Sequence, residues 1–429
     1  MGTKTFKLPE MKYLLKNLLL WLLLLVTTSA MAQITEKPVL TLEEALLQME
    51  QNYPQLKQYD YRRQAVEARV AGARSWMPPQ VTVGLSRLPY DPKMIDMPIM
   101  ENQSGLMIGV EQMIPSRAKQ RAKERYLQAQ VPAIAQQQKW TQNELRAEVR
   151  QLYFTRYVSE KMLQVIGKSE RVLNLLIKSS EAQYAYNQAQ LNNIYSARAR
   201  LQELQNLRLA QKQMIIESTL GLNTLMGRPV DQEFVVDTLQ EPSLGLAAFL
   251  LADTTTSRSD IAVMEASIQA MRANQEVMRS ELRPEFGVRF EHMPMFNMES
   301  MYSAMVMVSL PFMPWANKMN KAEVKGMELD ILAMQREKET MQVMQRRMAT
   351  EKQAMWKLER ERLQNYRQKV LPAYRKALDV NLLAYRQNTA NLFVVLEAWE
   401  MWQMKEMDYY TLLDKALRLE VEYARELEK

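Results

Sequence analysis

Four short segments of the chain alternate between apolar and polar residues, and they occur as two pairs. The first pair lies within residues 80–113 and the second within residues 285–311. A period of two predicts β-strands with one apolar and one polar face. Each segment runs for about nine or ten residues, the length that crosses a bilayer as a tilted strand. A membrane-spanning strand with water on its inner side and a sandwich strand with one wet face both produce this alternation.

Each strand pair is followed by a much longer stretch with helical periodicity. Residues 116–226 and 316–428 each predict a long hairpin of two antiparallel helices, with breaks near residues 189–190 and 387–390. The first helix of the first hairpin, over residues 116–184, would be on the order of 100 Å long. Helices of this length indicate a rod or a tunnel wall rather than a compact domain.

A shorter helix precedes each strand pair. The first is predicted over residues 41–77 and the second over residues 259–282. Glu44 stands three residues after Thr41, which is the spacing of a capping box at a helix start. Pro78-Pro79 is expected to stop the first helix.

The order of helix, strand pair and helical hairpin therefore occurs twice. Pro79 and Pro284 are 205 residues apart, and a repeat this long needs neighbours to bury its faces. The predicted fold class is mainly α with a small β part and an internal two-fold repeat. The chain divides into a signal peptide at residues 1–32, a first repeat at 33–228, an irregular connector at 229–257 and a second repeat at 258–429.

The N-terminal residues have the three parts of a secretory signal. Lys12 and Lys16 precede an apolar core at residues 18–26, and residues 30–32 fit the small-residue cleavage rule. The core is shorter than the roughly 20 residues that a spanning helix needs, which disfavours an uncleaved membrane anchor. We therefore expect an exported chain that begins near Gln33.

Composition removes several classes of function. The sequence has no Cys and a single His, His292, which disfavours disulfides, thiolate metal sites and histidine-based catalysis. Its 11 Gly form no phosphate-binding array. The net charge of +7 is mild for 429 residues, and acidic residues are interspersed, so solvated helix faces explain it better than nucleic-acid binding. We therefore expect no enzyme, no cofactor and no nucleic-acid partner.

Four strands cannot close a barrel on their own. Open sheet edges are not tolerated in lipid, where each unpaired backbone group costs several kcal/mol. If the strands span a membrane, several chains must combine them, and twelve strands from three copies suit helices this long better than eight. Aromatic residues near the strand ends are typical of a membrane interface, although ordinary packing also places them there. They are Trp76, Tyr90, Phe296, Tyr302, Phe312 and Trp315.

Several short motifs, taken in order, resemble the TolC family of outer-membrane efflux channels over nearly the whole chain after the signal. They open the first repeat, end a helix in mid-chain, follow each strand pair and form the turn of the last helix pair. The motifs are Asn52–Leu56, Gly221–Pro229, Val110–Pro115, Val308–Phe312 and Ala384–Ala398. None is specific alone, but their order and their duplication are specific together.

This resemblance implies a homotrimer in the outer membrane with a large periplasmic portion. Each chain would give four strands to a twelve-stranded transmembrane β-barrel, surrounded by outer-membrane lipid, and its long helices to a periplasmic α-barrel tunnel with coiled-coil packing. The turns of the two helix pairs would form the periplasmic tip and meet an adaptor protein, which joins an inner-membrane pump. The tip residues are Ala189, Gln190, Asn388 and Thr389. The family usually has Gly at this turn, whereas Ala189 tolerates left-handed backbone poorly.

Methionine is unusually frequent, with 33 residues, and two groups accompany the strand pairs. Thioether sulfur is a soft ligand that suits Cu(I), so loop methionines with a nearby imidazole predict a soft-metal site. The alternative is that Met replaces Leu throughout the chain. The first group is Met94, Met97 and Met100. The second group is His292, Met293, Met295, Met298 and Met301.

A third line of methionines has a seven-residue spacing along one helix. This spacing is typical of a coiled-coil seam, in which these side chains would be packed core. The alternative is a ladder of sulfur atoms exposed to the tunnel, and the two interpretations differ in the burial that they predict. The residues are Met327, Met334, Met341, Met348 and Met355.

The leading hypothesis is a passive exit duct of a tripartite efflux pump. It would export small solutes from the periplasm to the exterior, with Cu(I) and Ag(I) as the favoured cargo and the copper/silver branch of the family as the favoured relative. A general drug-efflux or type I secretion channel of the same fold is the alternative. A periplasmic coiled-coil adaptor is the alternative of another class, but an adaptor would place compact β domains beside a single hairpin.

Overall fold

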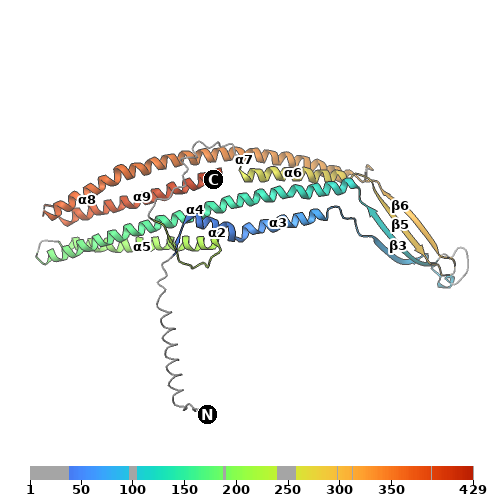
Figure 1. The fold of residues 1–429 in the computed structure, drawn as a ribbon, viewed down its shortest axis with the longest axis horizontal. Helices are drawn as coiled ribbons and strands as arrows, with labels where there is room; N and C mark the ends of the chain where they lie inside the picture. The colour runs from blue at the N-terminus through green and yellow to red at the C-terminus, as the bar shows by residue number, and fades with distance from the viewer. Residues whose placement is uncertain are drawn as a thin grey trace, which may run out of the picture.

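The computed structural model describes residues 38–95, 104–186, 190–238, 258–296, 298–311, 313–387 and 389–428. The predicted signal peptide and most of the predicted connector lie outside these residues. The molecule is elongated, with the helices in a long bundle and a β-sheet at one end (Figure 1).

The first half of the chain contains two short helices, a strand pair and a helical hairpin, in that order. A 3-10 turn, Pro92–Met94, follows the first strand of the pair. The elements are α2 (Leu42–Asn52), α3 (Pro54–Ala71), β2 (Gln80–Ser86), β3 (Gly105–Ile114), α4 (Arg117–Tyr184) and α5 (Leu191–Met226).

The second half repeats this order with one interruption in its long helix. The elements are α6 (Ser259–Ser280), β5 (Glu285–Met293), β6 (Met301–Ser309), α7 (Lys318–Asn365), α8 (Leu371–Arg386) and α9 (Leu392–Leu427). A π-helical segment, Tyr366–Val370, joins α7 to α8 just before Pro372. The extra residue per turn in this segment lets the helix continue past a proline that cannot donate a backbone hydrogen bond.

The predicted capping box forms at the start of α2. The Thr41 hydroxyl accepts a hydrogen bond from the Glu44 backbone N–H at 3.3 Å, and the Glu44 carboxylate accepts one from the Thr41 backbone N–H at 3.1 Å. The prediction of one helix over residues 41–77 is wrong in two places. Tyr53 is extended because Pro54 follows it, and the helix ends at Gly72 rather than at Pro78-Pro79.

Four strands form one antiparallel sheet in the order β2-β3-β5-β6. Each strand pair is a neighbour-to-neighbour hairpin, and β3 joins the two hairpins by pairing with β5, from Ile108 opposite His292 to Ile114 opposite Phe286. Within the described chain, the outer edges of β2 and β6 have no strand partner. The sheet is therefore open on both sides.

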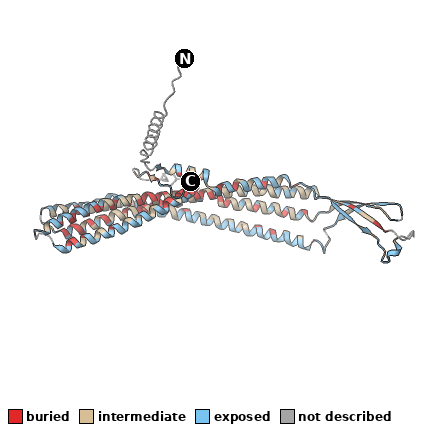
Figure 2. Cartoon of the chain, turned by 90° about the horizontal axis from the view of Figure 1, so that it is seen from below, coloured by how far each residue is buried: buried red, intermediate tan, exposed pale blue. Residues whose placement is uncertain are grey.

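The helical bundle buries its apolar residues in two large clusters, and Figure 2 shows buried residues concentrated along the bundle rather than in the sheet. The first cluster lies where α2, α4, α5 and α9 meet, and it includes Met49, Phe154 and Leu222. The second joins the two hairpins toward their turns, with Leu173 of α4 and Trp399 of α9 among its members. The helical part therefore has a core of its own.

Part of the predicted irregular connector is ordered. Two short strands, β1 (Val39–Leu40) and β4 (Val235–Val236), pair in parallel, and Phe234 beside them is buried. The buried Arg156 side chain of α4 donates a hydrogen bond to the Phe234 carbonyl at 2.8 Å and forms an ion pair with Glu160 at 2.6 Å. The short apolar run at residues 234–236 thus anchors the connector to the bundle. The prediction missed it because the surrounding Pro and Asp residues are typical of irregular structure.

Candidate functional site

The sheet presents one face made almost entirely of apolar side chains, and this face is exposed. The register aligns Val83 of β2 with Ile108 of β3, and Val288 of β5 with Val306 of β6. Val83 is 65% exposed and Val306 is 73% exposed, although residues of this type are usually buried. A contiguous apolar surface of this size marks contact with lipid or with another protein.

The opposite face carries charged and hydroxyl side chains near its centre. Arg289 lies 2.7 Å from Glu291 on its own strand and 3.9 Å from Glu111 on β3. Ser303 of β6 donates a hydrogen bond to Glu291 at 3.2 Å, and Glu291 is only 9% exposed. Because residues on a strand alternate between faces, these groups all lie opposite the apolar surface. The sheet thus separates an apolar side from a polar side.

Methionines lie on the polar face both above and below these charges. Gly287 makes room for two of them, since a Cβ atom at Gly287 would lie 2.5 Å from the Met113 sulfur and 3.2 Å from the Met307 terminal methyl. Three strands therefore bring two thioether groups together over one glycine. The methionines of this face are Met107, Met113, Met293, Met301, Met305 and Met307.

The methionines predicted to lie on loops are only partly on loops. Met293 and Met301 are the last and first residues of β5 and β6 and lie directly opposite each other. Met295 forms an isolated bridge with Gly105, and Met298 lies beyond the strand ends and is exposed. The structure therefore brings Met293 and Met301 together at the hairpin end of the polar face.

The predicted imidazole does not join this group. His292 follows the alternation of β5 and lies opposite Tyr302 on the apolar face, whereas Met293 lies on the polar face. Met94 is exposed at the end of the 3-10 turn and belongs to no strand. Met97 and Met100 lie outside the described residues. Within the described part of the chain, no group of three His, Asp or Glu side chains could hold a metal ion.

Four methionines of the polar face, Met107, Met113, Met305 and Met307, were not among the predicted site residues. The strand alternation alone indicates that each lies opposite its apolar neighbours. Their mutual approach depends on the pairing of β3 with β5, which joins residues far apart in the sequence. The alternation could have identified these residues as candidates, and the register then brings Met113 and Met307 together over Gly287.

The seven-residue line of methionines on α7 starts in the packed face and leaves it. Met327 is 8% exposed, Met334 and Met341 are half-buried, and Met348 and Met355 are exposed, at 43% and 45%. A seven-residue step falls about 20° short of two helical turns, so the line rotates away from the packed face. Its buried positions pass to the following residues, and Ala349 and Trp356 are both buried.

The two helix-pair turns lie side by side at the end of the bundle farthest from the sheet (Figure 1). The Tyr385 hydroxyl of α8 donates a hydrogen bond to the Gln183 side chain of α4 at 2.8 Å. Gln190 is the residue before α5, and Thr389 donates backbone and side-chain hydrogen bonds to the Ala384 carbonyl at 2.9 and 3.0 Å. Both Gln190 and Thr389 are exposed. The other predicted tip residues, Ala189 and Asn388, lie outside the described residues.

An ion cluster holds the sheet against the helices. Lys119 of α4 lies 2.8 Å from Glu281, just after α6, and 2.9 Å from Glu285, the first residue of β5. Partial burial by itself would lower the pKa of Lys119, but hydrogen bonds and charge from both carboxylates together raise it above its ordinary value. The cluster therefore fixes the start of the second strand pair to the long helix of the first repeat.

Known structures share this arrangement, although no family model and no curated protein sequence matches the chain. The outer membrane protein VceC from Vibrio cholerae matches 90% of this chain and 95% of its own, with a TM-score of 0.72 and 13% identity. CusC, from a study of its transmembrane channel formation, matches 90% and 91%, with a TM-score of 0.72 and 14% identity. The Campylobacter jejuni CmeC outer membrane channel matches 90% and 85%, with a TM-score of 0.71 and 12% identity.

The chain therefore has the fold of outer-membrane channels, which is the fold that the resemblance to the TolC family implied. VceC and CusC match equally well, so the likeness is to the fold that they share rather than to one branch. Among the described residues, none of the helices is both long enough and apolar enough to cross a membrane.

Proposed function

We propose that this chain is the outer-membrane exit duct of a tripartite efflux pump, a passive conduit from the periplasm to the exterior. The observation that carries the proposal is the sheet at the end of the bundle, which exposes an apolar face and places charges on the other. Lipid on one side and water on the other satisfy both faces. The helices would extend into the periplasm after removal of the signal peptide at residues 1–32.

We infer three copies from the unpaired edges of the sheet. Strand edges in lipid must find partners, so β2 of one copy would pair with β6 of the next until the ring closes. Three copies would supply twelve strands and a ring of helices below them. Apolar residues exposed on α7 support contacts between copies along the helices. They include Leu329, Leu332, Val343 and Leu358.

The far end of the bundle supports docking to a periplasmic adaptor. Gln190 and Thr389 are exposed at the turns, and the apolar or aromatic side chains of Tyr186, Tyr195 and Phe393 are exposed beside them. Aromatic side chains with one apolar and one polar part are common anchors of protein interfaces. The proposed conduit is passive and performs no chemical reaction. The adaptor would therefore connect it to an inner-membrane pump that supplies the energy.

The proposed cargo is a soft metal ion, Cu(I) or Ag(I). Thioether groups are preferred by these ions, and the polar face of the sheet offers two separate sets of them. Met113 and Met307 meet over Gly287 near the helices, and Met293 lies opposite Met301 near the hairpin ends. Such weak neutral ligands would let an ion exchange between sites without being trapped.

Two matched variants test the metal sites. Replacing Met113, Met293, Met301 and Met307 with Leu removes four thioethers from the sheet and nearly conserves their volume. Replacing Met327, Met334, Met341 and Met348 with Leu removes four from the seam of α7. We expect Cu(I) affinity of the purified protein to fall at least about tenfold in the first variant only, a change of about 1.4 kcal/mol. Equal affinity in wild type and the first variant would reject the sheet sites, and a loss confined to the second would favour the α7 ladder.

Two broader measurements separate the functional alternatives. Deletion of the gene should sensitise cells to copper or silver more than to detergents and dyes, and equal sensitivity would favour a general drug-efflux or secretion channel. A periplasmic adaptor would stay in the soluble fraction after cell lysis, whereas the proposed duct should need detergent. The exposed apolar face of the sheet is the physical reason for this requirement.

A further inference from the structure

A hollow of about 290 Å³ lies between α4 and α6, just beneath the sheet. Small side chains such as Ala122 and Ala273 line its walls, which leaves the space open. Three arginines surround it, Arg121 and Arg125 from α4 and Arg283 from the segment that leads into β5. All three arginines are exposed.

The charge in this hollow is not neutralised. Within the described part of the chain, Arg121, Arg125 and Arg283 form no ion pair. The acidic side chain that lines the hollow, Glu276, is already paired with Arg279 at 2.6 Å. Guanidinium groups are planar, permanently charged donors that bind phosphate through two parallel hydrogen bonds. The hollow therefore has the chemistry of a phosphate site.

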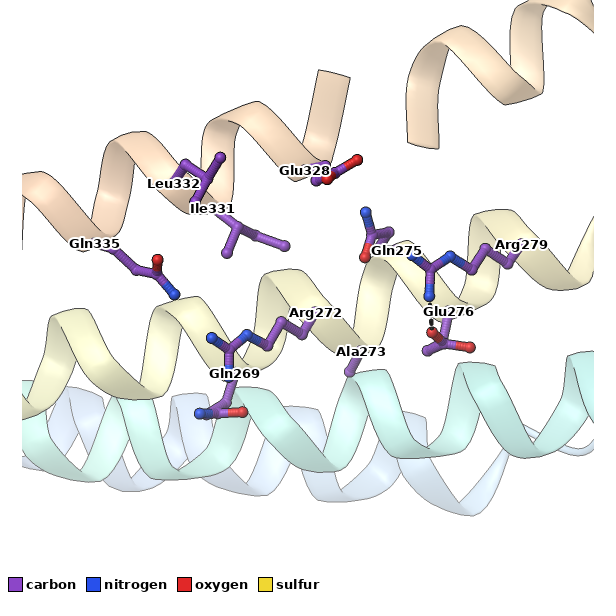
Figure 3. A pocket seen from close by; sticks show the side chains of 10 residues that line it. All are labelled: Gln269, Arg272, Ala273, Gln275, Glu276, Arg279, Glu328, Ile331, Leu332 and Gln335. Atoms are coloured by element: carbon purple, nitrogen blue, oxygen red, sulfur yellow. Dashed lines mark hydrogen bonds and ion pairs between the residues drawn. The ribbon is translucent and has the colours of Figure 1, made fainter. Parts of the chain in front are cut away.

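A second, wider hollow of about 590 Å³ extends this surface along the groove between α6 and α7. It shares Glu276 with the first hollow and adds Arg272 and Arg279 from α6. Figure 3 shows these arginines on α6, with Ile331 and Leu332 on α7 lining the other wall. On the α7 wall these two apolar residues stand between Glu328 and Gln335, so the arginines of this groove all come from α6.

The two arginines of α4, Arg121 and Arg125, lie on the same side as the apolar face of the sheet. Lys119 contacts Glu285, which belongs to the polar face of β5. Arg121 is two residues further along α4, a rotation of about 200°, so it points away from Lys119. Arg125 is six residues further, which places it about 120° from Lys119 on that same outer side. The arginine surface therefore continues the apolar face.

The order of residues from the sheet toward the helices matches the layers of a bilayer. The apolar strand residues come first, followed at the helix end of the sheet by the exposed Trp76 and Trp315, before β2 and after β6. The arginines follow at once, because α4 begins three residues after β3 ends. Hydrocarbon, interface and phosphate favour these three residue types in that order.

We propose that the α4–α6 hollow binds the phosphate of a phospholipid headgroup in the membrane leaflet that faces the periplasm. This inference rests on the proposed membrane insertion of the sheet, and it adds a lipid site that the exit-duct function does not require. Phosphate on the arginines would fix how deeply the sheet enters the bilayer and how the helices stand beneath it. A phospholipid is favoured over a free anion because the hollow lies directly below the apolar face.

The test uses the full mature protein in vesicles of phosphatidylcholine with added phosphatidylglycerol. Anionic lipid retained by the purified protein is measured by native mass spectrometry. We expect wild type to retain phosphatidylglycerol selectively, and a variant with Arg121→Gln, Arg125→Gln and Arg283→Gln to bind it on the order of a hundredfold more weakly, given about 1 kcal/mol for each basic residue at an anionic surface. A control with the same loss of charge on exposed residues toward the far end of the helices, Arg171→Gln, Lys178→Gln and Arg386→Gln, should behave as wild type.

Several outcomes would overturn the inference. Unchanged lipid selectivity in the Arg121, Arg125 and Arg283 variant would reject it. Displacement of bound phosphatidylglycerol by inorganic phosphate would also reject it, because it would indicate a site for free anions. A variant with Lys at the same three positions keeps the charge and should keep selectivity, which controls for misfolding. If wild type does not enter vesicles at all, the proposed function fails. If it enters them without lipid selectivity, only this inference fails.

Discussion

The helical bundle and the sheet use apolar residues in opposite ways. Phe154 and Leu173 of α4 are fully buried in clusters formed by the chain itself, whereas Val83 and Val306 of the sheet are largely exposed. A single chain therefore forms an apolar core within the bundle but none within the sheet. The difference indicates that the bundle folds against its own residues, and that the sheet depends on surroundings which one chain in water does not provide.

The two regions also differ in how their polar groups are held. In the bundle, buried charges such as Arg156 are paired within the chain. In the sheet, charges such as Arg289 and Glu291 gather on one face, and the backbone edges of β2 and β6 remain unpaired within the described chain. Lipid on one face, water on the other and a second strand at each edge, as in the proposed trimer, would satisfy all of these groups.

The largest expected effect comes from placing charge on the apolar face. Val83→Arg should cost about 2–4 kcal/mol per copy if Val83 lies near the middle of the bilayer. Insertion into vesicles, measured by flotation with lipid, should fall sharply, while the helical content in detergent stays unchanged.

The matched control is Thr82→Arg, one residue earlier on the polar face. It should insert nearly as well as wild type, because water would reach the new charge. Equal loss in both variants would show that the two faces of the sheet are not in different solvents.

A core truncation in the bundle should have the opposite effect: it should weaken the helices and leave the insertion of the sheet unchanged. Phe154→Ala should lower the free energy of unfolding of the helices by about 3–5 kcal/mol, because it opens a cavity in the first cluster. Thermal unfolding followed by circular dichroism measures this change, and Lys178→Ala on the exposed surface of α4 should change it by less than about 0.5 kcal/mol. If Phe154→Ala also unfolded the sheet in vesicles, the stability of the sheet would depend on that of the bundle, contrary to expectation.

Two strand glycines give a smaller and sharper comparison. Gly287→Ala places a methyl group against Met113 and Met307, whereas no atom lies within 4 Å of the corresponding position at Gly84. We expect Gly287→Ala to destabilise the inserted protein by about 1–3 kcal/mol, as overpacking does, and to weaken Cu(I) binding. Gly84→Ala should change neither quantity. Urea unfolding in vesicles measures the stability, and identical behaviour of the two variants would mean that the thioethers are free to move aside.

The smallest expected effect is a dependence on pH within the bundle. Burial raises the pKa of Glu406 on α9, against the opposing charges of Lys168 and Arg375. A raised carboxyl pKa means that the folded state favours the protonated form, so this contribution is present below the ordinary pKa and is lost as pH rises through the raised value. Glu406→Gln should therefore raise the melting temperature at neutral pH and leave it unchanged in acid below the ordinary pKa. An increase of the same size at both pH values would exclude titration of Glu406 as the cause.

Most of the fold could be predicted from the sequence because the patterns that define its helices and strands are local. Period-two alternation identified all four strands of the sheet, and Thr41 with Glu44 identified a helix start that the structure confirms. The break at Tyr53 was missed because helical periodicity continues on both sides of Pro54. The signal for it was present, since the residue before a proline favours an extended backbone.

The arrangement of the site was less accessible from the sequence. That Met293 and Met301 lie opposite each other, and that Met113 and Met307 meet over Gly287, follows from pairing between segments far apart in the chain. His292 was grouped with the methionines because it is next to Met293, although neighbours in a strand point to opposite faces. Sequence proximity thus predicted a cluster that strand geometry divides.

In the proposed trimer, three copies combine their open sheets into one closed ring. The chain has no Cys, so single cysteines can be placed at Thr82 in β2 and at Ser303 in β6, and joined by a short bifunctional maleimide in membranes. We expect covalent trimers as the largest product when both cysteines are present. With either cysteine alone, we expect nothing larger than the dimers that chance contact produces. Monomers only, or a ladder that continues past the trimer, would contradict it.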